Sequence, residues 1–124
     1  RAIETLNIGH LKHRAPHKLS GGEKRNVAIA AVLAMNPEVL LFDEPSSYLD
    51  PKSRRNFIRA MEKLRHTKLI ATHDLDLVLD LCERVIILKN GKVFADGMPI
   101  ELFMNKELME ESGLETPLSL QHKV

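Results

Sequence analysis

Residues 19–51 read LSGGEKRNVAIAAVLAMNPEVLLFDEPSSYLDP, and they carry the clearest structural signals of the chain. Ser20, with Glu23 three residues later, forms a capping box and predicts that a helix begins here. The run that ends at Met35 is almost wholly apolar, which is typical of a helix buried on all sides, and an Asn-Pro pair stops it. Residues 39–42 are apolar throughout and precede turn-forming residues, which predicts a buried parallel strand.

The rest of the chain continues the alternation of helices and strands. Asp50 before Pro51 is a strong helix start, and the Asn-Gly pair at 90–91 predicts a hairpin. The tail after Gly113 carries little pattern. Strands that alternate with helices of about 10–15 residues indicate an α/β layered fold. The expected elements are helices over 51–65, 74–82, 99–104 and 106–111, with strands over 68–71, 85–88 and 93–95.

The composition is that of an ordinary globular protein. The 124 residues carry 18 Lys and Arg against 17 Asp and Glu, a net charge of +1, which gives no general attraction to nucleic acid or membrane. No apolar run approaches the roughly 18 residues of a membrane-spanning helix. The one cysteine, Cys82, excludes an internal disulfide and fits a reducing compartment. The chain begins at Arg1 without an initiator Met, so we expect a piece of a longer protein.

A pair of glycines, Gly21 and Gly22, lies at the start of the first predicted helix. Glycines let the backbone approach a ligand, and the free N–H groups and dipole of a helix N-terminus suit a phosphate oxygen. An ordinary capping box behind a glycine turn is the alternative. The two interpretations are compatible, because the cap would also fix Ser20 in place.

Two adjacent carboxylates, Asp43 and Glu44, end the predicted strand over 39–42. Mg²⁺ prefers one or two carboxylates together with phosphate oxygens. Successive side chains diverge along a strand, so one carboxylate could serve the metal while the other polarises an attacking water. A solvated acidic turn before Pro45 is the alternative.

Two further segments follow strands or open helices, where an α/β sheet places its ligand groups. Ser47 to Asp50 is accounted for as a helix start alone. His73 follows the predicted strand over 68–71 and would share the carboxyl edge of the sheet with Glu44. An isolated histidine is more often a satisfied structural residue, and the other histidines show no metal-ligand spacing.

Together and in this order, these segments resemble the C-terminal portion of an ABC-type nucleotide-binding domain. Leu19-Ser20-Gly21-Gly22-Glu23 is similar to the signature motif LSGGQ, with Glu in place of Gln. Val39–Glu44 resembles the Walker B strand, Ser47–Asp50 the D-loop, with Tyr48 in place of a small residue, and His73 the switch histidine. The sequence of the chain is also similar to those of the energy-coupling-factor ATPases of cobalt and nickel importers.

The resemblance implies an ATP- and Mg²⁺-dependent ATPase that works as a head-to-tail dimer of two ABC ATPase subunits. Asp43 would hold Mg²⁺, Glu44 would be the general base and His73 would hydrogen-bond the γ-phosphate region. The signature residues Leu19 to Glu23 would contact the nucleotide of the opposite subunit, and Ser47 and Asp50 would bridge the two sites. A transmembrane permease subunit would be the second partner, at the cytoplasmic face of the membrane, with no nucleic acid.

The phosphate loop Gly-x-x-x-x-Gly-Lys-Ser/Thr of this family occurs nowhere in the chain. The expected fold is therefore a partial P-loop NTPase-like α/β domain without its N-terminal Walker A half, which becomes a required partner. Residues 1–18 would end the helical subdomain, 19–97 would form the motif-bearing core and 98–124 the C-terminal helices. A non-transport assembly module of the same superfamily, or an isolated piece without activity, remains the alternative to a transporter subunit.

Overall fold

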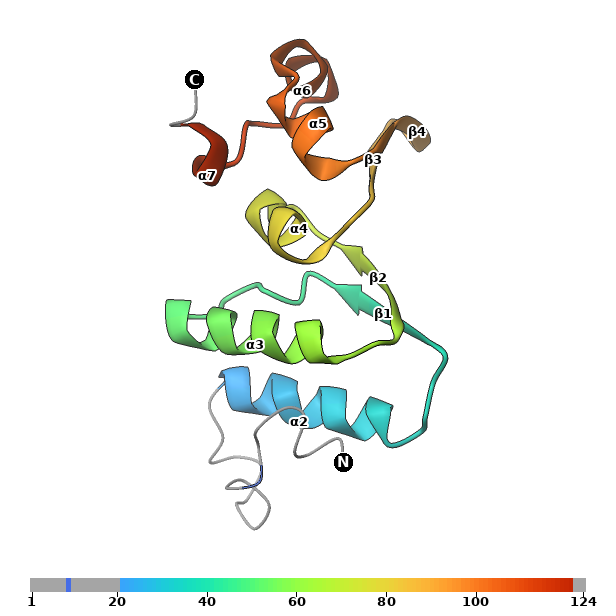
Figure 1. The fold of residues 1–124 in the computed structure, drawn as a ribbon, viewed down its shortest axis with the longest axis vertical. Coiled ribbons are helices and arrows are strands. Elements are labelled where there is room, and N and C mark those ends of the chain that lie inside the picture. The colour runs from blue at the N-terminus through green and yellow to red at the C-terminus, as the bar shows by residue number, and fades with distance from the viewer. Residues whose placement is uncertain (1–8, 10–20, 122–124) are drawn as a thin grey trace. The chain divides into compact units, whose positions relative to one another are not determined.

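A computed structural model describes residue 9 and residues 21–121, which divide into two compact units at the boundary between Thr72 and His73. Each unit is described by itself. The cap expected at Ser20 and, apart from residue 9, the segment over 1–18 lie outside the described residues. Figure 1 shows the helices and strands of both units.

The first unit has the element order helix, strand, helix, strand. Its elements are α2 (Gly21–Leu33), β1 (Val39–Asp43), α3 (Pro51–Lys63) and β2 (Thr67–Ala71). The two strands are parallel, and the crossover between them contains α3, as a parallel pair requires. Figure 1 shows α2 and α3 side by side and beginning at the same end of the unit. The expected strand–helix–strand order of this region is confirmed.

The start of α3 follows the sequence pattern closely. Asp50 is the N-cap, and its side chain accepts a hydrogen bond from the backbone N–H of Ser53 at 3.3 Å. Pro51 occupies the first turn, where a missing N–H costs nothing. The ring of Phe57 then meets that of Phe42 on β1 edge-on, with centroids 6.2 Å apart. The buried apolar residues of this unit are Ile29, Ala30, Leu40, Phe57, Ala60, Met61 and Leu64.

Two burial predictions for this unit are wrong for the described part of the chain. The helix α2 was expected to be buried on all sides, yet Val27 and Val32 are exposed. The strand β1 was expected to be buried on both faces, yet only Leu40 is buried and Leu41 is exposed. Alternate side chains of a strand point to opposite faces, and among the described residues α3 supplies a cover for the Leu40 face. Burial on both faces needs a layer on each side of the sheet.

The second unit packs four short helices against a hairpin. Its elements are α4 (Leu75–Leu81), β3 (Val85–Lys89), β4 (Lys92–Gly97), α5 (Pro99–Met104), α6 (Lys106–Ser112) and α7 (Leu118–Gln121). The strands are antiparallel, and both turn residues, Asn90 and Gly91, have positive φ, as in a type I′ turn. The hairpin and the helices expected over 74–82, 99–104 and 106–111 are confirmed. The buried core of this unit is Val78, Ile87, Phe103, Met109 and Leu120.

The tail after Gly113 is more ordered than the sequence indicates. It forms the short helix α7, whose Leu120 is buried in the core of the second unit. Ser119 on the same helix hydrogen-bonds the carboxylate of Asp76 on α4 through its hydroxyl. A single buried leucine in a four-residue helix gives no periodic signal, so pattern reading misses it. In the described part of the chain, no helix has the length and apolar character needed to cross a membrane.

Candidate functional site

Glu44 is fixed at the carboxyl end of the parallel strand pair. Its backbone N–H donates to the carbonyl of Ala71, the last residue of β2, at 2.8 Å. Its backbone is left-handed, with φ of +47°, a conformation that few side chains adopt without support. The hydroxyl of Thr72 donates to Glu44 Oε2 at 3.2 Å. Backbone and side chain of Glu44 are thus both tied to the end of β2.

Asp43 and Glu44 lie in different surroundings, Asp43 as the last residue of β1 and Glu44 just beyond the strand. Asp43 pairs with Ala71 in the sheet register and its residue is exposed, whereas Glu44 is half-buried. One carboxylate therefore faces solvent while the other is held against the neighbouring strand end. This arrangement suits a division of roles between the two groups.

The loop between β1 and α3 is a compact run of turns. Ser47 N–H donates to the Glu44 carbonyl at 3.2 Å, so the loop begins directly on the carboxylate residue. Tyr48 has φ of +63° and is fully exposed. Asp50 ends the loop, and hydrogen bonds from the side chain and backbone of Ser53 lower its pKa. These hydrogen bonds therefore favour the ionised form of the Asp50 carboxyl.

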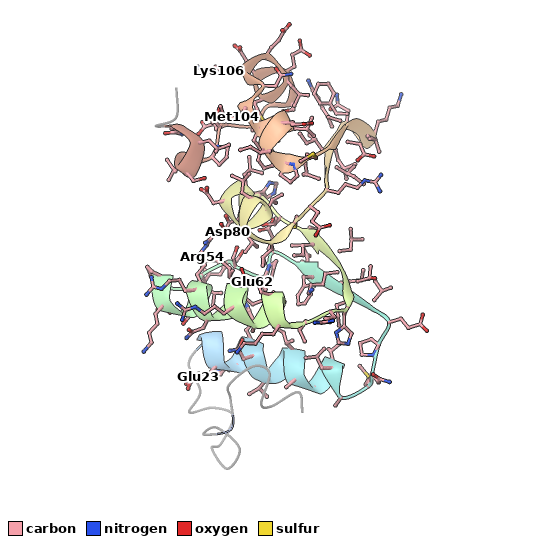
Figure 2. The ribbon with its side chains drawn as sticks, in the orientation of Figure 1. Glu23, Arg54, Glu62, Asp80, Met104 and Lys106 are labelled. Atoms are coloured by element: carbon pink, nitrogen blue, oxygen red, sulfur yellow. The ribbon has the colours of Figure 1, made fainter. Side chains whose placement is uncertain are left out.

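The glycine pair at the start of α2 contributes in two different ways. A Cβ on Gly21 would meet nothing within 4 Å, so this backbone is open to approach. A Cβ on Gly22 would lie 3.0 Å from Ser53 Oγ and 3.6 Å from Leu49 Cδ2, so Gly22 is packed against the start of α3. Figure 2 shows Glu23 on the first turn of α2 and Arg54 on the first turn of α3.

The remaining predicted site residues are only partly described. Leu19 and Ser20 lie outside the described residues. His73 is exposed and begins the second unit, next to Asp74, whose side chain accepts the N–H of Leu77 at 2.9 Å. Its expected place beside Glu44 stays a prediction.

Three comparisons with known proteins bear on the family to which this chain belongs. A family model described as "AAA domain, putative AbiEii toxin, Type IV TA system" matches residues 2–80. An ABC transporter ATP-binding protein of Geobacter sulfurreducens is 49% identical over 120 residues, which cover 97% of this chain and 48% of the relative. The chain belongs to the AAA-domain family, among its ABC-type ATP-binding proteins.

Other members of the family agree in sequence and in fold. The energy-coupling factor transporter ATP-binding protein EcfA2 of Methanospirillum hungatei is 40% identical over 123 residues, covering 97% of this chain and 31% of the relative. The structure of cbiO1 from Clostridium perfringens, part of the ABC transporter complex cbiONQ, superposes with a TM-score of 0.77 at 40% identity. That match covers 89% of this chain and 45% of the other.

The fold of this ABC-type chain is part of a P-loop NTPase α/β fold, as the sequence predicts. The chain spans about half the length of the curated relatives it matches, at 48%, 50% and 43% for three of them. The matches therefore establish the family of this chain and the fold of its described residues.

The donor set of the site fits Mg²⁺ in part. Among residues 21–121 and residue 9, no three His, Cys, Asp or Glu side chains gather in a way that could hold a metal ion. Mg²⁺ in phosphoryl-transfer sites is held by one or two carboxylates, with phosphate oxygens and water as its other ligands. The exposed carboxylate of Asp43 at the end of β1 could supply one such ligand.

Three residues that were not among the predicted site residues connect the site. The guanidinium of Arg25 on α2 donates to the carbonyl of Pro45, just after the carboxylates. Ser53 lies between Gly22 and Asp50, and Thr72 contacts Glu44. Thr72 was visible as the neighbour of His73, but a hydroxyl on a strand end carries no specific signal. In the sequence alone, Arg25 and Ser53 look like ordinary helix residues. Their contacts with distant residues are apparent only in the folded chain.

Proposed function

We propose that this chain supplies the signature, Walker B and switch portion of an ABC transporter ATPase subunit. The observation that carries the proposal is the fixed carboxylate of Glu44 at the carboxyl end of the β1–β2 pair, beside the exposed carboxylate of Asp43. Ligands of open α/β sheets bind outside this end of the strands. The names of the relatives support ATP as the nucleotide.

The proposed chemistry divides the work among three side chains. Asp43 would hold Mg²⁺, and Glu44 would accept a proton from the hydrolytic water as general base. Mg²⁺, when bound, neutralises charge on the phosphate oxygens during transfer. His73 donates a hydrogen bond to the γ-phosphate region. Positioning and charge neutralisation then supply most of the rate.

A second subunit completes each site in this proposal. The signature residues Leu19 to Glu23 contact the nucleotide held by the opposite subunit, where the open backbone of Gly21 allows close approach. Ser47 and Asp50 connect the two sites across the head-to-tail dimer. The N-terminal Walker A half supplies the cradle for the phosphates, since the chain contains no such loop.

A chimaera tests the ATPase proposal. The 120 matched residues of the Geobacter sulfurreducens relative are replaced by this chain, and ATP hydrolysis is measured with and without Mg²⁺. Glu44→Gln keeps the shape of the side chain and removes the base, so hydrolysis should fall at least 100-fold, as removal of a general base does. Glu62→Gln, an exposed residue on α3, is the matched control and should leave the rate unchanged. An active Glu44→Gln chimaera would overturn the role of Glu44.

We further propose import as the work that hydrolysis drives, with cobalt or nickel ion as the first cargo to test. The support is the similarity to an energy-coupling factor ATP-binding protein and to cbiO1 of a transporter complex. The subunit would then act at the cytoplasmic face of the membrane, on a transmembrane permease. Affinity capture of the tagged full-length protein from membranes should recover an integral membrane protein. Recovery of soluble partners alone would favour a non-transport assembly module.

The isolated chain is proposed to lack activity of its own. Calorimetry with Mg-ATP should show no binding up to millimolar nucleotide, because the phosphate-cradling loop is not in this sequence. Micromolar binding by the 124-residue chain would contradict this part of the proposal.

A further inference from the structure

Thr72 and Glu44 extend the parallel strand pair by one position beyond its ladder. The register pairs Asp43 with Ala71, and the next residues along the two strands are Glu44 and Thr72. The N–H of Glu44 donates to the Ala71 carbonyl at 2.8 Å, and the Thr72 hydroxyl donates to Glu44 Oε2 at 3.2 Å. Contacts between the same two chain segments thus hold Glu44 at two points, one on its backbone and one on its carboxylate.

The backbone of Glu44 adds a reason to expect a positioning device here. A non-glycine residue at φ of +47° is uncommon, and such conformations persist where the surroundings hold them. The left-handed backbone turns the Glu44 side chain away from the direction that an extended strand would give it. A flexible side chain that leaves such a backbone needs a further contact if its carboxylate is to stay in one place.

The properties of threonine fit this task. The β-branched side chain has few χ1 rotamers, so its hydroxyl is held in a narrow range of directions. The hydroxyl O–H donates a charge-assisted hydrogen bond to a carboxylate oxygen, and the proton stays on the hydroxyl. Thr72 is half-buried at the strand end, which limits competition from water for this bond.

We propose that Thr72 is the positioning residue for the general base, and that its hydroxyl fixes the Glu44 carboxylate in the direction needed to accept a proton from the attacking water. This inference rests on the proposed ATPase function. Thr72 makes no chemical step of its own, so its removal should lower the rate of hydrolysis without weakening nucleotide binding.

The test uses the chimaera described above and three variants. Thr72→Val keeps the shape and removes the hydroxyl, and should lower kcat by about 10- to 100-fold, the cost of a misplaced catalytic group, with KM for ATP within about twofold of wild type. Thr72→Ser restores the donor and should recover most of the rate. Thr67→Val, at the exposed first residue of β2, is the matched control and should change neither parameter.

The background of Glu44→Gln separates positioning from a general structural effect. There Thr72→Val should cause no further loss, because the group that it positions no longer acts as a base. An undiminished kcat in Thr72→Val, or an equal loss in Thr72→Ser, would overturn the inference while leaving the role of Glu44 intact. A chimaera whose hydrolysis is indifferent to Glu44→Gln would instead overturn the proposed function.

A measurement on the 124-residue chain tests the contact without any activity. In a carbon-13 NMR spectrum, Thr72→Val should shift the carboxyl signal of Glu44, whereas Thr67→Val should leave it in place. An unmoved Glu44 signal in Thr72→Val would show that the hydroxyl does not position the carboxylate.

Discussion

Ser53 Oγ lies 3.0 Å from the point that a Cβ on Gly22 would occupy, so the start of α2 and the start of α3 meet across a glycine. The same Ser53 hydrogen-bonds Asp50 at the end of the loop between β1 and α3. One serine therefore lies against the start of α2 and also bonds the residue that caps α3. A side chain at position 22 would crowd Ser53, independently of any ligand.

Gly22→Ala should destabilise the chain relative to Gly21→Ala. Alanine is the better helix former at both positions, but at position 22 its Cβ forces Ser53 to move, and such overpacking costs about 1–3 kcal/mol. At position 21 an added Cβ would have no described atom within 4 Å, so Gly21→Ala should be neutral or slightly stabilising. Urea unfolding of both variants measures the difference in the free energy of unfolding. Equal stabilities would show that Ser53 gives way without cost.

Ser53→Ala should raise the pKa of Asp50 toward its ordinary value. The side-chain and backbone hydrogen bonds from Ser53 lower that pKa, and the substitution removes the first of them. Because the folded-state pKa lies below the unfolded value of about 3.9, this contribution to stability is present above that pH and is lost as the pH falls through the lowered pKa. Carbon-13 NMR titration of the Asp50 carboxyl measures the shift. Ser112→Ala, in the second unit, should leave that titration unchanged.

Leu40→Ala and Leu41→Ala should differ sharply, although the two leucines are neighbours on β1. Leu40 is 3% exposed and Leu41 is 74% exposed. Truncation of a buried leucine costs about 2–5 kcal/mol, and truncation of an exposed one changes stability by less than about 0.5 kcal/mol. Urea unfolding of the isolated chain distinguishes them. A large cost for Leu41→Ala would mean that a self-associated chain covers this face, and sedimentation velocity would reveal that association.

The local signals of this sequence predicted its elements well. Asp50 with Pro51 started a helix, and Asn90 with Gly91 closed a hairpin, because each motif acts through its own few residues. The apolar run over 39–42 predicted a strand in the same way. The predictions of burial failed. An apolar residue such as Leu41 is stabilised by burial, but its identity does not show which segment of the chain would cover it.

In the candidate site, too, local features were predictable from the sequence and long-range contacts were not. The carboxylates Asp43 and Glu44 were predictable because their residue types carry chemistry at the end of an apolar strand. The partners that fix them were not, since Thr72 is 28 residues from Glu44 and Ser53 is 31 residues from Gly22 in the sequence. Contacts at such separation depend on the register of β1 with β2 and on the packing of α2 against α3, which no local pattern encodes.

Leu120→Ala tests the short helix α7, which the sequence did not indicate. Leu120 is 3% exposed within the core of the second unit, and its neighbour Leu118 is 72% exposed. Leu120→Ala should cost about 2–5 kcal/mol, while Leu118→Ala should cost less than about 0.5 kcal/mol. Hydrogen exchange of the β3 and β4 amides measures both, because loss of core packing around Ile87 lowers the free energy of opening the hairpin. Equal protection in the two variants would mean that α7 contributes nothing to this core.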